Sequence, residues 1–343
     1  MRSSGLGSYA LSSCVAAALL AGCGGSQPPI GAPGAMPQSR AVAKHAAHGT
    51  SWMLPDTKSS PTYKVTSPLL YVTNFDSPPY DGVTVYNAKK NNPAPIAVIN
   101  ANIFQPGGDC IDGDGTLYVA SGPGSSLGWI SEYALGKTTP LRIITQGING
   151  PAFCAIDAHG NLWVTNAGSG VTEYLKGSTV PHFTLSSGLT SPDGIAIDRV
   201  GNIYVGNLQP YGISNVQVYP PGKKSPSRTI TDGITWPVGI AVDAEGTLYV
   251  TNDISPCNIE KYRAGQNRPY ETITKDIDGP TAVTFSRTGR MYVVNEGELS
   301  CKSNGPWPVI LEFRARRISP SKRMISGDLH VPLGAAYYPP LLP

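Results

Sequence analysis

Amide and carboxylate side chains recur at one point of a pattern that repeats along the chain. An Asn closes a short apolar run such as "YVTN" five times, with Ser121 at the sixth place; these are Asn74, Asn166, Asn207, Asn252 and Asn295. Three acids that do not repeat lie near these positions, namely Asp193, Asp253 and Glu296. Because Ca²⁺ prefers oxygen ligands of these two types, one interpretation is a single divalent cation held where they converge. In the other, each Asn caps the turn that leaves its own strand, and the acids are solvated loop charges.

Aromatic residues accompany these polar positions in the more variable segments: Tyr80, Trp129, Tyr211 and Trp307. Their rings could stack on sugars or on the apolar groups of a partner, or pack between structural units. The sequence holds no serine elbow, phosphate loop or HExxH pattern. We therefore assign no catalytic residue, and no cofactor is expected beyond the possible cation.

A repeat positions all of these residues. The "YVTN"-like run begins at residues 71, 118, 163, 204, 249 and 292, at intervals of 41 to 47 residues. Residues 192–237 give one unit of four short strands: "GIAID" (a), "NIYVGN" (b), "NVQVY" (c) and "SRTIT" (d). The a–b turn is Asp-x-x-Gly in four units, as from Asp198 to Gly201, and this pattern favours a tight hairpin. The "DGDG" stretch at 112–115 falls in the same register, so we interpret it as a turn.

Six four-strand units without helical periodicity predict an all-β, six-bladed β-propeller over residues 67–343. The chain supplies a strand b without a preceding strand a at its start ("LLYVTN") and a strand a without a following strand b at its end (332–339). We expect these two strands to pair and close the ring. The segments "PDGIAIDRVGNIYV" and "PVGIAVDAEGTLYV" resemble NHL repeats, and "YVTN" is similar to the YVTN-type propeller repeat.

The N-terminus is typical of an exported protein. Residues 1–22 combine one Arg with an apolar run too short to span a bilayer, which indicates a signal peptide. "LAGC" at 20–23 resembles the lipobox of bacterial lipoproteins. The resemblance implies that Cys23 is acylated, and Gly24 after it favours the outer membrane. Residues 23–66 are rich in Gly, Pro, Ala and Ser, and we interpret them as a disordered tether.

Two cysteine pairs remain. Cys257 and Cys301 follow the Asn of neighbouring strands b at similar distances, so in an oxidising compartment we expect a disulfide between them, free or metal-bound thiols being the alternative. Cys110 and Cys154 lie in neighbouring strands a but one position out of register. We expect these two to face opposite ways and to act as small buried residues.

These observations lead to three functional hypotheses: a binding module, a metal-dependent hydrolase, and a purely structural scaffold of the cell envelope. The net charge of +3 and 14% charged residues argue against nucleic-acid binding. In a propeller the b–c and d–a loops share one face, so the first hypothesis is a monomeric, lipid-anchored module of the cell envelope that binds a protein or glycan there. The alternative rests on similarity to gluconolactonase-type propellers, which implies a metal-dependent hydrolase using a Glu, Asn, Asn, Asp set.

Overall fold

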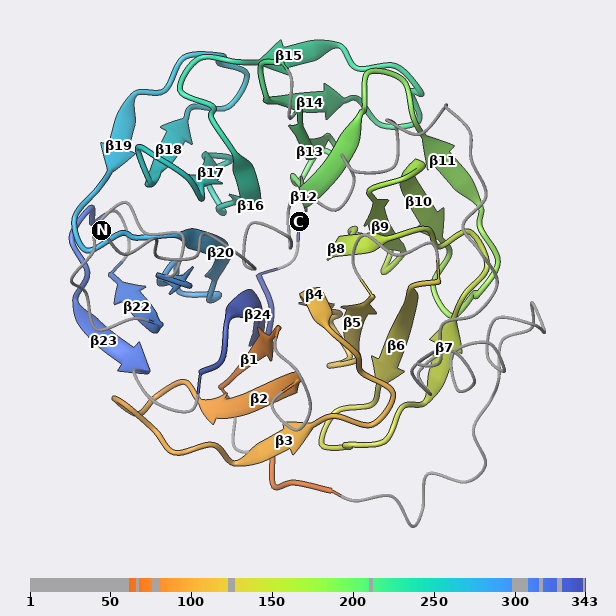
Figure 1. The fold of residues 1–343 in the computed structure, drawn as a ribbon, viewed down its shortest axis with the longest axis vertical. Helices are drawn as coiled ribbons and strands as arrows, with labels where there is room; N and C mark the ends of the chain where they lie inside the picture. The colour runs from red at the N-terminus through yellow and green to blue at the C-terminus, as the bar shows by residue number, and fades with distance from the viewer. Residues whose placement is uncertain are drawn as a thin grey trace, which may run out of the picture.

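The computed structural model describes residues 62–65, 68–75, 81–122, 127–209, 212–297, 308–314, 317–325, 329–341 and 343. Within these ranges the regular structure consists of 24 strands in six antiparallel sheets of four. The sheets stand around a central axis like blades (Figure 1). The predicted six-bladed β-propeller is confirmed.

Each blade runs from an inner strand a to an outer strand d, and blades 1 to 6 are numbered in the order of the lists below. Strands a are β24 (Pro332–Tyr338), β4 (Pro106–Ile111), β8 (Pro151–Ile156), β12 (Ser191–Ile197), β16 (Pro237–Val242) and β20 (Pro280–Phe285). Strands b are β1 (Leu69–Asn74), β5 (Leu117–Ser121), β9 (Leu162–Asn166), β13 (Ile203–Leu208), β17 (Leu248–Asn252) and β21 (Met291–Asn295). Strands c are β2 (Gly82–Asn87), β6 (Trp129–Tyr133), β10 (Gly170–Tyr174), β14 (Asn215–Tyr219), β18 (Asn258–Tyr262) and β22 (Val309–Phe313). Strands d are β3 (Ala97–Ile99), β7 (Arg142–Ile144), β11 (Phe183–Leu185), β15 (Arg228–Ile230), β19 (Glu271–Ile273) and β23 (Lys322–Ile325).

Blade 1 closes the ring with strands from both ends of the chain. The C-terminal strand β24 pairs with β1 in antiparallel register, with Leu69 opposite Tyr338 and Val72 opposite Ala335. This confirms the predicted closure. The pairing gives both strands a partner and removes the edge that an open ring would expose.

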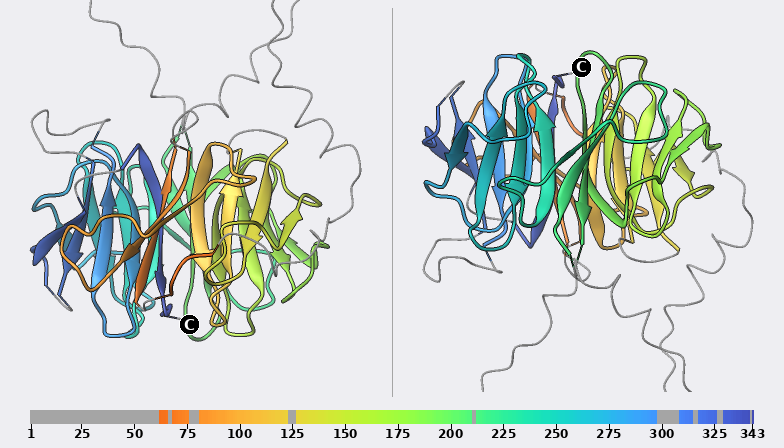
Figure 2. Two further views of the ribbon diagram at one scale, coloured as in Figure 1. Left: turned by 90° about the horizontal axis from the view of Figure 1, so that it is seen from below. Right: turned by 90° about the horizontal axis from the view of Figure 1, so that it is seen from above.

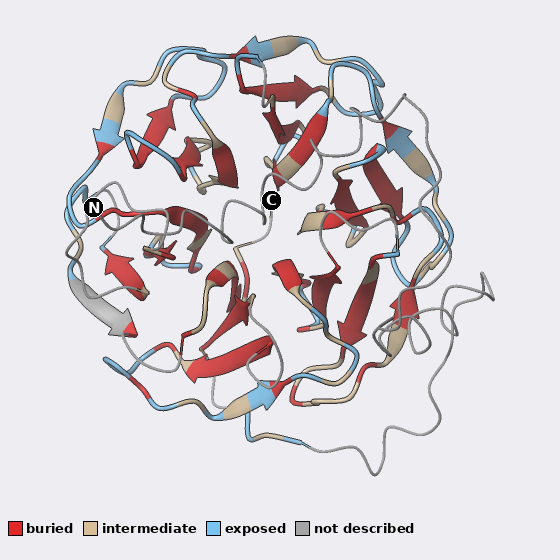
Figure 3. Ribbon diagram, in the orientation of Figure 1, coloured by how far each residue is buried: buried red, intermediate tan, exposed pale blue. Residues whose placement is uncertain are grey.

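Burial follows the position of a strand in its blade. Strands b and most strands c are buried along their whole length, whereas four strands d (β3, β11, β15 and β19) each carry an exposed residue (Figure 3). Apolar side chains from facing sides of neighbouring blades fill the space between them; Ile130 and Ile144 of blade 2 share one cluster with Val164 of blade 3. Each blade is therefore covered on both faces, which explains why the strand-b runs are almost continuously hydrophobic.

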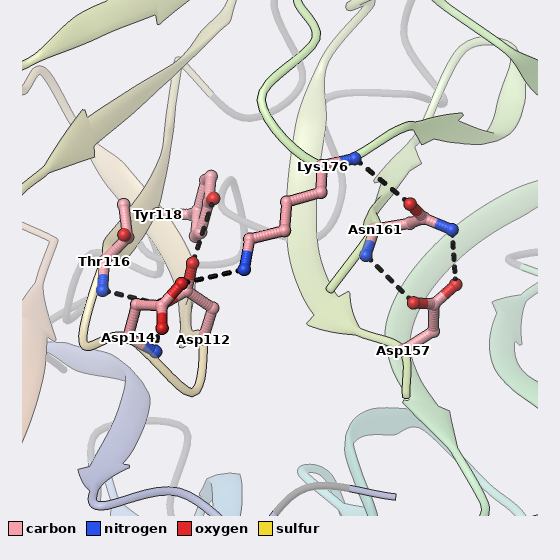
Figure 4. A network of polar contacts seen from close by, with 7 residues as sticks. All are labelled: Asp112, Asp114, Thr116, Tyr118, Asp157, Asn161 and Lys176. Atoms are coloured by element: carbon pink, nitrogen blue, oxygen red, sulfur yellow. Dashed lines mark hydrogen bonds and ion pairs between the residues drawn. The ribbon is translucent and has the colours of Figure 1, made fainter. Parts of the chain in front are cut away.

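The a–b turns form a hydrogen-bonded frame at one end of the ring. In blade 3, Oδ1 of Asp157 accepts hydrogen bonds from the backbone N–H groups of His159 (2.8 Å) and Asn161 (2.9 Å), and Oδ2 accepts one from Nε1 of Trp163 (3.1 Å). Figure 4 shows this turn beside the "DGDG" turn, where Asp112 makes the equivalent contacts. Gly160 adopts φ +80°, which explains the Gly at this place. The prediction that "DGDG" is a plain hairpin turn is confirmed.

The segment 62–65 joins this same end of the ring. The backbone N–H of Tyr63 donates to the carbonyl of Gly136 in the c–d turn of blade 2 (3.0 Å), and its hydroxyl lies 2.8 Å from that of Tyr71. These residues were assigned to the tether by the sequence analysis, yet they contact the propeller. Among the described residues, no helix has the length and apolarity needed to cross a bilayer.

Cys110 and Cys154 form a disulfide, so the prediction that they are separate buried residues was wrong. Their Cα atoms lie 5.6 Å apart. The expectation that the two side chains face opposite ways overlooked how blades stack. Each blade packs one face against the next blade and its other face against the previous blade. Side chains on opposite faces of β4 and β8 therefore meet between the two blades.

Candidate functional site

The repeated asparagines bind the protein's own backbone. Oδ1 of Asn252 accepts hydrogen bonds from the backbone N–H groups of Thr235 (2.8 Å) and Trp236 (3.3 Å), and its Nδ2 donates to the carbonyl of Gly233 (2.8 Å). All five asparagines are buried. In the other four blades the Asn Oδ1 likewise accepts a hydrogen bond from a backbone N–H group. The pairs are Asn74 with His330, Asn166 with Asn149, Asn207 with Thr190, and Asn295 with Asp278.

These contacts refine the capping interpretation. The loop that each amide holds is the d–a connection entering its blade, 16 or 17 residues earlier in four of the blades, and not the turn that leaves strand b. In blade 1 the same contact spans the two ends of the chain, from Asn74 to His330. The asparagines therefore brace the loop face against the core.

The unrepeated acids gather at the loop-face end of three consecutive blades. Asp193 lies in the bulge of β12 in blade 4, Asp253 directly follows β17, and Glu296 directly follows β21. A fourth acid, Asp278, precedes β20 and is buried. The backbone N–H of Glu296 donates to the carbonyl of Gly279 (2.8 Å), which ties the last two segments together. We call Asp193, Asp253, Asp278 and Glu296 the acidic mouth.

Burial and mutual repulsion set the protonation of the acidic mouth. Asp253 is 3% exposed and its Oδ1 has no hydrogen-bond partner among the described residues. Burial, and then the nearby Asp278 carboxylate, raises the pKa of Asp253 to about 7. The pKa of Asp193 is likewise raised to about 7, first by burial and then by Asp253. These carboxyl groups share little stabilisation within the protein, and a positive charge brought to them would lower both pKa values.

The predicted cation ligands differ in what surrounds them. In the described ranges, no three His, Cys, Asp or Glu side chains converge closely enough to hold a metal ion. The acids form a row of neighbours along the mouth, and the asparagines that were predicted to join them use their oxygens in the loop contacts above. The carboxyl groups of the acidic mouth can interact with positively charged groups of a ligand that extends along it.

Of the remaining predicted residues, the structure describes Trp129 and Cys257. Trp129 begins β6, where its Nε1 donates to the carbonyl of Asn102 (2.8 Å), so its polar edge serves the protein. Cys257 is buried and disulfide-bonded, while Cys301 lies outside the described residues, so their pairing stays a prediction. Cys23, Tyr80, Tyr211 and Trp307 also lie outside the described residues.

Sequence reasoning missed two acids. Asp278 was not listed among the candidates, although it stands two residues before the Pro that opens strand a, where other blades have Asn149, Thr190 and Thr235. Asp109 was passed over within "GGDCI", where attention went to the adjacent Cys110. Aligning the six strands a against their strand-b partners would have exposed it, as described below.

Comparison with known proteins defines the fold. No family model matches the chain, and no curated protein matches it in sequence. A chain of the nidogen/laminin complex superposes with a TM-score of 0.63 at 17% identity, covering 79% of this chain and 98% of its own length. A protein of unknown function from Bacteroides caccae superposes with the same TM-score at 11% identity, covering 79% and 99%. At these identities the similarity is one of fold, a β-propeller.

Proposed function

We propose that this protein is a non-catalytic binding module of the cell envelope whose acidic mouth binds a positively charged group of a protein or glycan ligand. The observation that carries the proposal is the state of Asp253, a buried carboxyl beside a second acid, with one oxygen that no described residue partners. Burying such a group without a partner opposes folding, so its presence on a rigid ring favours a role in binding. Nidogen, to which the fold is similar, was solved in complex with laminin, and that precedent supports an interaction role.

The place where the tether joins the propeller leaves the acidic mouth accessible. Residues 62–65 lie against the c–d turn of blade 2, at the end of the ring opposite the mouth. If Cys23 carries a lipid, the flexible tether that its composition predicts, joined at that end, would keep the propeller near the membrane and leave the mouth open to ligands.

A metal-dependent hydrolase is the second candidate, and it would need Asp193, Asp253 and Glu296 to supply oxygen ligands to a divalent cation. In the described ranges no three such side chains converge closely enough to hold a metal ion, so the geometry favours the first candidate. A bound metal together with turnover of an ester or lactone would decide for this candidate.

Calorimetric titration of the purified full chain separates the two. The probes are tetralysine, calcium chloride and zinc chloride, followed by an ester and lactone panel. We expect tetralysine to bind and Asp253→Asn to weaken it about tenfold, since a charge-assisted contact is lost. Asp114→Asn is the matched control, because Asp114 is exposed at the a–b end and pairs with Lys176 (2.8 Å). Tetralysine binding that both variants weaken equally, or that neither weakens, would contradict the proposal.

A further inference from the structure

One position of strand a carries a carboxyl group in blade 2 and an uncharged side chain in the other five blades. This position of strand a pairs with the middle Val of strand b. In blade 2 Asp109 pairs with Val119. The equivalent residues of blades 3 and 4 are Cys154, which pairs with Val164, and Ile195, which pairs with Val205. The other members of the set are Ile240, Val283 and Ala335. The ring thus contains a layer of six equivalent side chains in which Asp109 is the single acid.

Asp109 has no counterpart for its charge in this layer. The residue is 7% exposed, and neither carboxylate oxygen has a hydrogen-bond partner among the described residues. Between blades 2 and 3, Cys154 at this position faces Cys110. By the same geometry, Asp109 faces Ala336 between blades 1 and 2. The carboxylate packs against the backbone of Gly334, where an added Cβ would lie 2.8 Å from Oδ1. Burial accordingly raises the pKa of Asp109 well above its usual range.

All six side chains of the layer line one cavity on the ring axis. The cavity has a volume of about 160 Å³. Its lining includes Asp109, Cys154, Ile195, Ile240, Val283 and Ala335. At the a–b end it is bordered by Pro340, Leu341 and Pro343, and the C-terminus lies at the centre of the ring and at one end of it (Figures 1 and 2).

Size and chemistry together select a class of ligand. A cavity of this volume is large enough for a molecule the size of benzene. Its lining combines aliphatic side chains of the layer with polar ones, namely Asp109, Thr284 and Tyr337. A small apolar body bearing one cationic hydrogen-bond donor matches both parts of the lining.

We propose that the axial cavity binds a small organic ammonium ion, with its ammonium group on the Asp109 carboxylate and its apolar body against Ile195, Ile240 and Val283. The ion supplies the donors that the carboxylate lacks, and the aliphatic layer removes the body from water. This site is distinct from the acidic mouth, because it uses a different carboxyl and a different part of strand a.

The test titrates the full chain at pH 8 with benzylammonium and, in parallel, with toluene as the uncharged probe. Two variants address Asp109: Asp109→Asn keeps the shape, and Asp109→Val restores the residue type of the other blades. We expect benzylammonium to raise the melting temperature of the unmodified protein, and both variants to weaken its binding at least tenfold. Toluene should bind Asp109→Val at least as well as the unmodified protein. Asp253→Asn, in the acidic mouth, should leave benzylammonium binding unchanged.

Three results would overturn this proposal: no binding of benzylammonium, binding by both Asp109 variants that is as tight as binding by the unmodified protein, or loss of binding in Asp253→Asn alone, which would move the site to the mouth. If Asp109→Asn does not fold, Asp109→Val still decides, because it places a common core residue of this layer in the cavity. Tetralysine is too large for the cavity, so its binding tests the acidic mouth separately.

Discussion

The propeller carries two sets of carboxylates at opposite ends, and they differ in what they bind. At the a–b end, Asp198 accepts hydrogen bonds from the backbone N–H groups of Val200 and Asn202, from the Asn202 amide and from the Tyr204 hydroxyl. In the acidic mouth, Asp253 keeps an oxygen without a hydrogen-bond partner among the described residues. The first kind recurs from blade to blade, whereas the second breaks the repeat.

This difference separates structural from functional acids. A repeated carboxylate with all its acceptor sites used stabilises the fold wherever it occurs. An unrepeated one with buried, unused acceptors adds nothing to the blade and carries a desolvation penalty. The first kind stabilises the fold, and the second kind comprises the residues to which the proposed function attributes ligand binding.

The largest expected effect comes from removing a repeated carboxylate. Asp198→Ala deletes four hydrogen bonds, two of them from backbone N–H groups of the turn. We expect the free energy of unfolding to fall by about 3 kcal/mol, at roughly 1 kcal/mol for each bond with partial compensation by water. Urea denaturation measures it, with Asp114→Ala, which removes an exposed acid in the a–b turn of blade 2, as a control near zero. A loss below about 0.5 kcal/mol would contradict the assignment of the repeated turn carboxylates to fold stability.

The bracing asparagines come next. Asn252→Ala leaves the N–H of Thr235 and the carbonyl of Gly233 without their side-chain partner. We expect a loss of about 2 kcal/mol in the free energy of unfolding, while tetralysine binding per folded molecule is retained. Binding that vanishes although the variant is folded would assign Asn252 to the ligand site instead.

The change in the free energy of unfolding for each pH unit is expected to be smaller than the effects of these two substitutions. Folded Asp253 retains its proton up to a pKa of about 7, whereas an unfolded Asp loses it near pH 4 (about its ordinary value). The folded state therefore binds more protons between these values, so the free energy of unfolding falls as the pH rises from about 4 to about 7 and then levels off. The slope for one such group is about 1.4 kcal/mol per pH unit at most. Denaturation curves for Asp253→Asn should lose part of this slope, and an identical slope would contradict the assignment.

The smallest expected effect is at the mouth itself. Asp253→Asn removes a buried charge but leaves a polar group there, so at pH 8 we expect a gain of about 1 kcal/mol in the free energy of unfolding. Thermal denaturation of the variant and the unmodified protein at pH 8 provides the comparison. A loss of 2 kcal/mol or more, on the order of a broken structural contact, would place Asp253 among the structural acids.

Local repetition is what made the fold predictable. The spacing of the strand-b runs, the Asp-x-x-Gly turns and the unmatched strands at the two ends determine the blade count and the closure of Leu69 onto Tyr338. These features depend on residues near one another in sequence, or on a simple count of strands. No knowledge of the distance between blades was needed.

The functional features depend on contacts between blades, and for that reason the sequence left them open. The disulfide joins residues on opposite strand faces, which meet only because blades stack face to face. The mutual effect of Asp193, Asp253 and Asp278 arises where three blades converge. Asp109 is the third residue after the Pro that opens its strand, as are its five equivalents, so an alignment of the six units reveals the acid but not its burial between blades.

The most direct test of the central claim is a ¹³C-carboxyl NMR titration of the full chain and of Asp253→Asn. We expect a carboxyl resonance whose titration midpoint lies near pH 7 and which is absent from the variant. Addition of tetralysine should move this midpoint to lower pH. A spectrum in which no carboxyl that depends on Asp253 titrates above about pH 5 would contradict it, because such a group would be stabilised by the protein like the acids of the turns.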